Sequence, residues 1–286
     1  MDSERVYVSM VGYVDVAVRE LQFEHISTRE VPISQPITDL TPVPVDGREH
    51  KRLRKALGIL GWMVAVYRFD LAYVHSMIAQ FTAKPVRGAL SAIDNVFKYV
   101  KATRDFALSV PIHTERNNFL FFTDSDHAAN PGPINARRSQ FGAIVIMNGA
   151  PIYWKSTVDS NATSHPNMTM AEPVPSVGEA ETMALSNGVS AFTHISYVIE
   201  EMSLSDFPLP IPIRTDSKTA EAFAKGTLRS KMKHIDTRQQ WVCAMRNHEI
   251  IKVSHIPGVD NLADILTKIP TKAFFLKCRN ALCIFK

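Results

Sequence analysis

Helical periodicity dominates the stretch that begins at Arg48. Apolar residues recur there at the spacing of one helix face as far as Phe81, and the same spacing returns between Pro85 and Thr103. We therefore predict a small helical domain over residues 46–112. Its outer faces are basic, and composition alone favours solvated faces over contacts with phosphate.

The first 45 residues carry a different pattern. Two apolar runs, at 6–18 and 31–37, have the character of short strands, and the Pro-rich passage at 38–47 has the composition of a linker. We predict two short strands in this N-terminal segment, residues 1–45, and assign it no function.

Strand patterns replace the helical ones farther along the chain. Short apolar runs at 119–123, 141–147 and 151–155 each suit a buried strand, and Asn148-Gly149 separates the last two. Asn-Gly between two such runs is the strongest short-range indication of a hairpin, because both residues tolerate the positive φ of a type I′ turn. The pattern predicts three antiparallel strands.

Alternating helices and strands follow these three strands. Ser176 and Glu179 have the spacing of a capping box, which predicts the start of a long helix that runs to about Glu201. The later predicted elements are a strand at 211–215, helices at 217–225 and 232–247, a strand at 249–256 and a last helix that begins within 261–268. These patterns predict an α/β domain over residues 113–286, with a mixed five-stranded sheet and helices on its faces.

Composition limits the class of protein. Of the 286 residues 45% are hydrophobic, which is ample for one large domain or two ordinary ones. A net charge of +4 permits a nucleic-acid partner without demanding one. The three cysteines form no Cys-x-x-Cys pair, which argues against a disulfide framework or a zinc module. We find no signal peptide and no apolar run long enough to span a bilayer, so we expect a cytoplasmic protein that is not secreted.

Four carboxylates stand out because of their places in these elements. Asp124 and Asp216 each stand where an apolar strand runs out. Glu181 is the single acid on the sheet-facing stripe of its predicted helix, and Asp264 lies in the last helix. Taken alone, Asp216 suits a helix N-cap and Asp264 a solvated helix acid. Asp126 is a second-choice ligand beside Asp124.

Adjacent strand ends and a packed helix could bring the four carboxylates to one end of the sheet. Clustered acids repel one another unless divalent cations neutralise them. Two Mg²⁺ ions roughly 3.5 to 4 Å apart, held by oxygen ligands, are what two-metal phosphodiester hydrolysis needs. The four acids are therefore candidates for such a site.

Several motifs add a resemblance to a known family. TDSDHAANPGP resembles the first-strand motif of ribonuclease H, GEAETMA its helix motif, RTDS its fourth-strand motif and IPGVDNLADILTK the terminal motif of retroelement ribonucleases H. KMKHIDTRQQWV and NLADILTKIP are similar to the end of copia-type retrotransposon polyproteins. LGILGWMVAVYRFDLAYVHSMIAQF and VFKYVKATRDFAL look like the segment that links their reverse transcriptase to ribonuclease H. The resemblance covers about Arg48 to Pro270.

The resemblance implies a ribonuclease H-like fold and its activity. It implies that metal-binding catalytic acids cut the RNA strand of an RNA/DNA hybrid with two Mg²⁺ or Mn²⁺ ions, and these acids are Asp124, Glu181, Asp216 and Asp264. The expected partners are the hybrid and the polymerase part of the same polyprotein, in the cytoplasm, in virus-like particles or in the nucleus. The candidate nucleic-acid-binding residues are Arg52, Lys55, Lys98, Lys101, Lys231 and Lys233.

The chain also departs from the family pattern. The loop at 157–175 is longer than expected, and the polar run before the helix acid is reduced to residues 175–178. The fingers and palm of a polymerase are missing, so we expect no DNA synthesis. A decayed or domesticated copy that binds nucleic acid without cleaving it is the main alternative, and an integrase-like nuclease is a third. His255 is either an aid to proton transfer, as in some cellular ribonucleases H, or a partly exposed strand residue.

Overall fold

The computed structural model describes residues 5–112, 118–127, 138–158, 176–202, 209–227, 233–282 and 284–285. These residues form two compact units. Unit 1 combines the described residues up to 112 with those from 268 onward, and unit 2 holds the described residues from 118 to 267.

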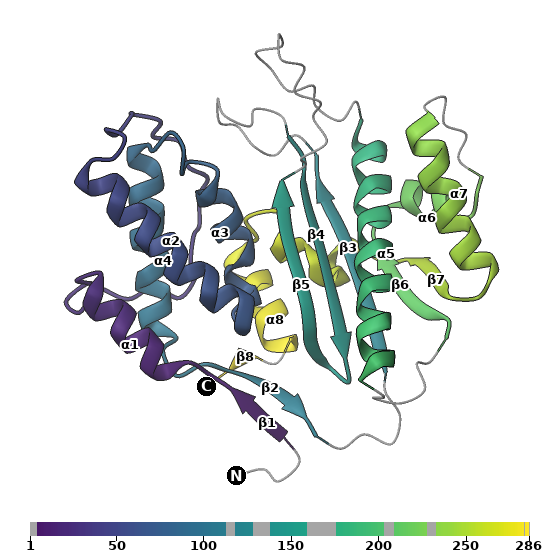
Figure 1. Cartoon of the computed structure of the whole chain (residues 1–286), viewed down its shortest axis with the longest axis horizontal. Helices are drawn as coiled ribbons and strands as arrows, with labels where there is room; N and C mark the ends of the chain where they lie inside the picture. The colour runs from purple at the N-terminus through teal and green to yellow at the C-terminus, as the bar shows by residue number, and fades with distance from the viewer. Residues whose placement is uncertain are drawn as a thin grey trace. The chain divides into compact units, whose positions relative to one another are not determined.

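A mixed five-stranded sheet forms the centre of unit 2 (Figure 1). Its strands are β3 (Phe119–Asp126), β4 (Gln140–Met147), β5 (Ala150–Val158), β6 (Ile211–Thr215) and β7 (Ile251–His255). They lie in the order β5-β4-β3-β6-β7, and the first three along the chain pair antiparallel. β6 pairs in parallel with both β3 and β7. The predicted fold class, a mixed five-stranded sheet with helices on its faces, is confirmed.

The hairpin between β4 and β5 turns where the sequence predicts it. Asn148 and Gly149 have φ angles of 54° and 84°, the left-handed conformation that a type I′ turn requires at both positions. The register pairs Met147 with Ala150, so the turn consists of Asn148 and Gly149 alone.

Helix α5 (Val177–Glu201) runs along β3 (Figure 1). It begins as predicted, since the Ser176 hydroxyl accepts a hydrogen bond from the Glu179 backbone N–H at 3.2 Å. Phe192 packs edge-on against Phe121 of the sheet, with ring centroids 6.4 Å apart. Val177, the first residue of the helix, is 60% exposed, so the sheet-facing stripe of α5 begins only after it.

The remaining elements of unit 2 lie between β6 and β7 and after β7. They are α6 (Lys218–Ala224), α7 (Lys233–Asn247) and the 3₁₀ helices η2 (Gly258–Asp260) and η3 (Leu262–Leu266). The predicted helix from residue 261 is thus only a short 3₁₀ turn. Pro270 keeps the helical backbone from resuming directly after it, because a proline disfavours that conformation in the residue before it, Ile269.

The N-terminal segment of unit 1 differs from the prediction. Only Arg5–Val8 forms a strand, β1, and α1 (Val11–Glu20) follows it, because Val14 and Ala17 bury one helical face. The predicted strand at 31–37 is wrong as well. Pro32 and Pro36 remove two of the backbone donors that a strand pairing would use.

Helices make up most of unit 1, as predicted. The first long apolar pattern divides into α2 (Arg48–Val66), η1 (Phe69–Leu71) and α3 (Ala72–Ala79), and the second forms α4 (Arg87–Ala102). Among the described residues, no helix has both the length and the apolar character that a membrane span requires.

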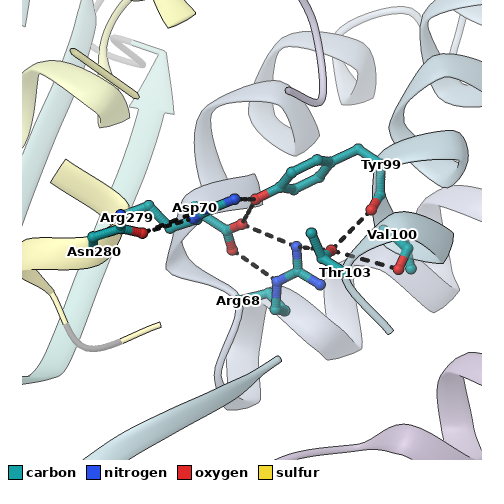
Figure 2. Close-up of polar contacts among 7 residues, drawn as sticks. All are labelled: Arg68, Asp70, Tyr99, Val100, Thr103, Arg279 and Asn280. Carbon is teal, nitrogen blue, oxygen red and sulfur yellow. Dashed lines mark hydrogen bonds and ion pairs between the residues drawn. The ribbon is translucent and has the colours of Figure 1, made fainter. Parts of the chain in front are cut away.

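A buried polar network interrupts the first helical pattern (Figure 2). The Arg68 guanidinium donates to both carboxylate oxygens of Asp70, at 2.8 and 2.9 Å, and to Thr103 Oγ1 at 3.0 Å. The Tyr99 hydroxyl donates to Asp70 at 2.7 Å. Burial opposes the charge on Arg68, but Asp70 outweighs it and raises the pKa of Arg68, while burial and Asp70 both raise the pKa of Tyr99.

The C-terminal residues complete unit 1. Helix α8 (Lys272–Ala281) places Phe275 edge-on against Tyr99, and Arg279 donates to the Tyr99 hydroxyl at 3.3 Å (Figure 2). Strand β8 (Ile284–Phe285) pairs with β2 (Ala107–Pro111), which also pairs with β1. The predicted domain of residues 113–286 therefore ends differently here, because the contacts of residues 268–286 group them with unit 1.

Candidate metal centre

Three carboxylates of unit 2 meet at one end of its sheet. Asp124 lies near the end of β3, Asp216 directly follows β6, and Asp264 lies in η3. Each offers an oxygen within 4.8 Å of the other two, and Asp124 and Asp264 are buried. The parallel pairing of β3 with β6 explains the meeting of the first two, because neighbouring parallel strands end at the same edge.

Asp216 is not the N-cap of a helix in the structure. Ser217 is the N-cap of α6, and its hydroxyl accepts from the Ala220 backbone N–H at 3.1 Å. Asp264 is 8% exposed, so it is not a solvated helix acid either. Both simpler alternatives that the sequence left open are therefore excluded in this structure.

Glu181 lies outside the group formed by the three aspartates. It stands half-buried on the second turn of α5, and Asp126 is likewise partly buried at the end of β3 without joining the group. The assignment of Glu181 as a fourth ligand remains a prediction.

Asn261 connects the carboxylates and was not among the predicted site residues. Its fully buried side-chain amide donates to Asp216 Oδ1 and to the Thr123 carbonyl, each at 3.1 Å, and lies 3.5 Å from Asp124 Oδ1. Its own oxygen accepts from the Ala263 backbone N–H at 3.2 Å. In the sequence, Asn before a helical turn indicates only an N-cap, so its second role could not be found there.

A second group of residues holds η3 against β4. Thr267 Oγ1 donates to Asp124 Oδ2, and Ser156 Oγ donates to the Leu266 carbonyl at 2.6 Å. Gly142, which pairs with Asp124 across the strands, allows this close approach. A Cβ atom at Gly142 would lie 2.7 Å from Thr267 Cγ2, which is closer than a Cβ atom approaches another side chain in real proteins.

The chemistry of this donor set fits a divalent cation. Asn261 and Thr267 are neutral donors, so they hold the carboxylates in place without cancelling their charge. Carboxylates this close together repel one another unless a cation or a proton intervenes. Carboxylate oxygens are the ligands that Mg²⁺ and Mn²⁺ prefer.

The candidate nucleic-acid-binding residues of unit 1 have partners within the chain. Arg52 donates to Asp94 at 2.5 Å, Lys55 lies 2.8 Å from Glu20, and Lys101 donates to the Ile26 carbonyl at 2.9 Å. Lys98 donates to Asn95 at 3.5 Å. Lys231 and the side chain of Lys233 lie outside the described residues. Contact of these six residues with nucleic acid stays a prediction.

His255 ends β7 with an exposed side chain. It lies near Glu221, whose pKa is lowered first by a hydrogen bond from Lys225 and less by His255. A role for His255 in proton transfer therefore also stays a prediction.

Comparison with curated proteins finds retrotransposon relatives. The chain is 27% identical over 252 residues to the truncated transposon Ty1-A Gag-Pol polyprotein and to the transposon Ty1-LR2 Gag-Pol polyprotein, both of Saccharomyces cerevisiae. The match covers 83% of this chain but only 19% and 13% of those relatives. No family model matches the chain.

Comparison with solved structures finds ribonucleases H. LC11-RNase H1, isolated from compost, aligns over 53% of this chain and 94% of its own, with 17% identity and a TM-score of 0.37. RNase H1 of the archaeon Halobacterium salinarum aligns over 52% of this chain and 94% of its own, with 15% identity and a TM-score of 0.35. Both scores are low, so the description of the fold rests on the observed strand order and pairing alone.

Proposed function

From the distant relationship of this chain to Ty1-type Gag-Pol polyproteins, we infer that it is a metal-dependent endonuclease that cleaves the RNA strand of RNA/DNA hybrids. The observation that carries this inference is the meeting of Asp124, Asp216 and Asp264 within 4.8 Å at one end of a ribonuclease H-like sheet. The substrate class comes from the resemblance of the motifs TDSDHAANPGP, GEAETMA, RTDS and IPGVDNLADILTK to those of ribonuclease H.

The three aspartates would hold the ions, and Glu181 would be the fourth ligand. Two bound Mg²⁺ or Mn²⁺ ions supply an activated water and stabilise the leaving oxygen of the phosphodiester. The protein's part is to fix the ligands: Asn261 and Thr267 orient two of the carboxylates, and burial excludes bulk water from Asp124.

A cleavage assay tests this function. The full chain should cut the RNA strand of a hybrid in Mg²⁺ or Mn²⁺ and leave single-stranded RNA and duplex DNA intact, and a chelator should abolish the cutting. Asp124→Asn keeps the size of the side chain but removes a ligand charge, so activity should fall at least about a thousandfold. Thermal stability should be unchanged or higher, because repulsion is relieved.

Asp126→Asn is the matched control, because Asp126 lies on the same strand outside the group. It should cost much less activity than Asp124→Asn. Equal losses at the two positions would contradict the choice of carboxylate. A chain that binds hybrid but cuts none of it under any metal condition would favour the alternative of a copy that binds without cleaving.

A further inference from the structure

A groove opens on the sheet of unit 2 beside α5, apart from the three aspartates. Its volume is about 400 Å³, within the usual range for ligand sites. β4 and β5 form its floor, α5 forms one wall, and α7 contributes to its lining through Arg238. The lining residues that carry the argument are Tyr153, Lys155, Asn187 and Arg238.

The packing of α5 explains why this space is open. α5 sits so close to β3 that a Cβ atom at Gly188 would lie 2.4 Å from Thr123 Cγ2. On its groove side the helix presents the small residues Ala184, Gly188 and Ala191. Their short side chains leave the adjoining face of β4 and β5 unfilled.

The chemistry of the groove suits an anion. Lys155 and Arg238 are cations, and no carboxylate is among the described lining residues. Asn187 and the Tyr153 hydroxyl add neutral donors. Burial raises the pKa of Tyr153 above its ordinary value, so its hydroxyl keeps its proton and remains a donor at neutral pH.

The groove also lies at the end of the sheet that carries Asp124. Lys155 pairs with Ala143 and Thr157 with Phe141, and both partners flank Gly142, the residue that pairs with Asp124. Side chains alternate along a strand, so the groove lies on the α5 face and η3 on the opposite face. The groove and the aspartates thus share one end of the sheet but open on opposite faces, so a nucleic-acid strand reaches both by passing around that end.

We propose that this groove binds backbone phosphates of the nucleic acid whose strand is cut at the aspartates, an inference that rests on the proposed function. Lys155 and Arg238 supply the charge, and Asn187 with the Tyr153 hydroxyl supplies orienting hydrogen bonds. Such contacts are independent of base sequence, so the groove grips the substrate without selecting a site along it.

Binding measured without metal tests the groove separately from cleavage. Fluorescence anisotropy of a labelled RNA/DNA hybrid with the full chain gives the affinity and its dependence on salt. The double variant Lys155→Gln/Arg238→Gln should bind about tenfold more weakly at ~0.15 M salt, and the slope of log K against log[salt] should become shallower by about 1.8. The control Arg246→Gln/Lys252→Gln removes the same charges from unit 2 outside the groove and should leave the slope closer to that of the unaltered chain.

Three results would overturn the proposal: an unchanged slope in the groove variant at an unchanged unfolding temperature, an equal change in the control, or full displacement of the hybrid by low-millimolar inorganic phosphate at constant ionic strength. The last result would assign the groove to free phosphate. If the unaltered chain binds hybrid through the groove but cuts nothing, the proposed function is wrong and the phosphate-binding role of the groove is retained. If the unaltered chain cuts hybrid and the groove variant binds hybrid with unchanged affinity, only the phosphate-binding role of the groove is wrong.

Discussion

At the scale of single residues, the site depends on neutral donors as much as on its acids. Asn261 reaches carboxylates from two strands and also caps η3, so one buried amide fixes three parts of the centre. Removing the Asn261 side chain takes away the hydrogen bond to Asp216 Oδ1 at 3.1 Å. It also removes the N-cap of η3, the segment that carries Asp264. Residues that orient ligands in this way typically change metal affinity or activity by about 10- to 100-fold.

Asn261→Ala should therefore raise the Mg²⁺ concentration for half-maximal hybrid cleavage by about tenfold or more. The free energy of unfolding should fall by about 1 to 2 kcal/mol, because a cap and buried hydrogen bonds are lost. A metal titration of activity, beside thermal unfolding, separates the two effects. Asn247→Ala, at an exposed asparagine, is the control and should change neither. An unaltered metal midpoint in Asn261→Ala would show that the amide is only structural.

At the scale of elements, the packing of η3 against β4 determines where Asp264 lies. Gly142 brings the backbone of β4 against Leu266 and Thr267, and Gln140 supports Ser156, which holds the Leu266 carbonyl. Gly142→Ala would place a Cβ 2.9 Å from Leu266 Cβ, so η3 must move away from the strand.

The expected result of Gly142→Ala is a loss of about 1 to 3 kcal/mol in stability from overpacking. Cleavage activity should fall by a larger factor than stability predicts, because Thr267 and Asp264 move away from Asp124. Gly58→Ala is the control, since a Cβ there meets nothing within 4 Å and favours the helix. Full activity in Gly142→Ala at lowered stability would disprove the coupling.

The sequence predicts some of these elements and contacts correctly, and the others depend on features that its local pattern does not contain. The sheet followed from short apolar runs and the Asn-Gly turn, because those patterns are local. The valines of Val11–Glu20 predict a strand because valine favours strands, although Val14 and Ala17 have the spacing of one helical face. The strand ends correctly brought Asp124 and Asp216 together, whereas the contacts of Asn261 and of residues 268–286 are long-range and leave no local pattern.

At the scale of the whole molecule, the chain crosses between its units directly after the site. Thr267 still contacts Asp124, and the residues from 268 onward belong to unit 1, where Arg279 joins the network around Tyr99. Each unit nevertheless has its own buried residues, the pair Arg68–Asp70 in unit 1 and the sheet core in unit 2. We therefore expect the two units to unfold in separable transitions that respond to different changes.

Asp70→Asn and added Mg²⁺ should act on different transitions. Asp70→Asn leaves the Arg68 charge buried without its counter-charge, so unit 1 should lose about 3 to 5 kcal/mol. Its control, Asp105→Asn, breaks a half-exposed pair with Arg104 and should cost less than about 1 kcal/mol. Mg²⁺ at a hundred times its dissociation constant should stabilise unit 2 by about 2.7 kcal/mol, and Asp124→Asn should remove that gain. Calorimetry in which Mg²⁺ and Asp70→Asn shift the same transition would contradict both the metal site and the independence of the units.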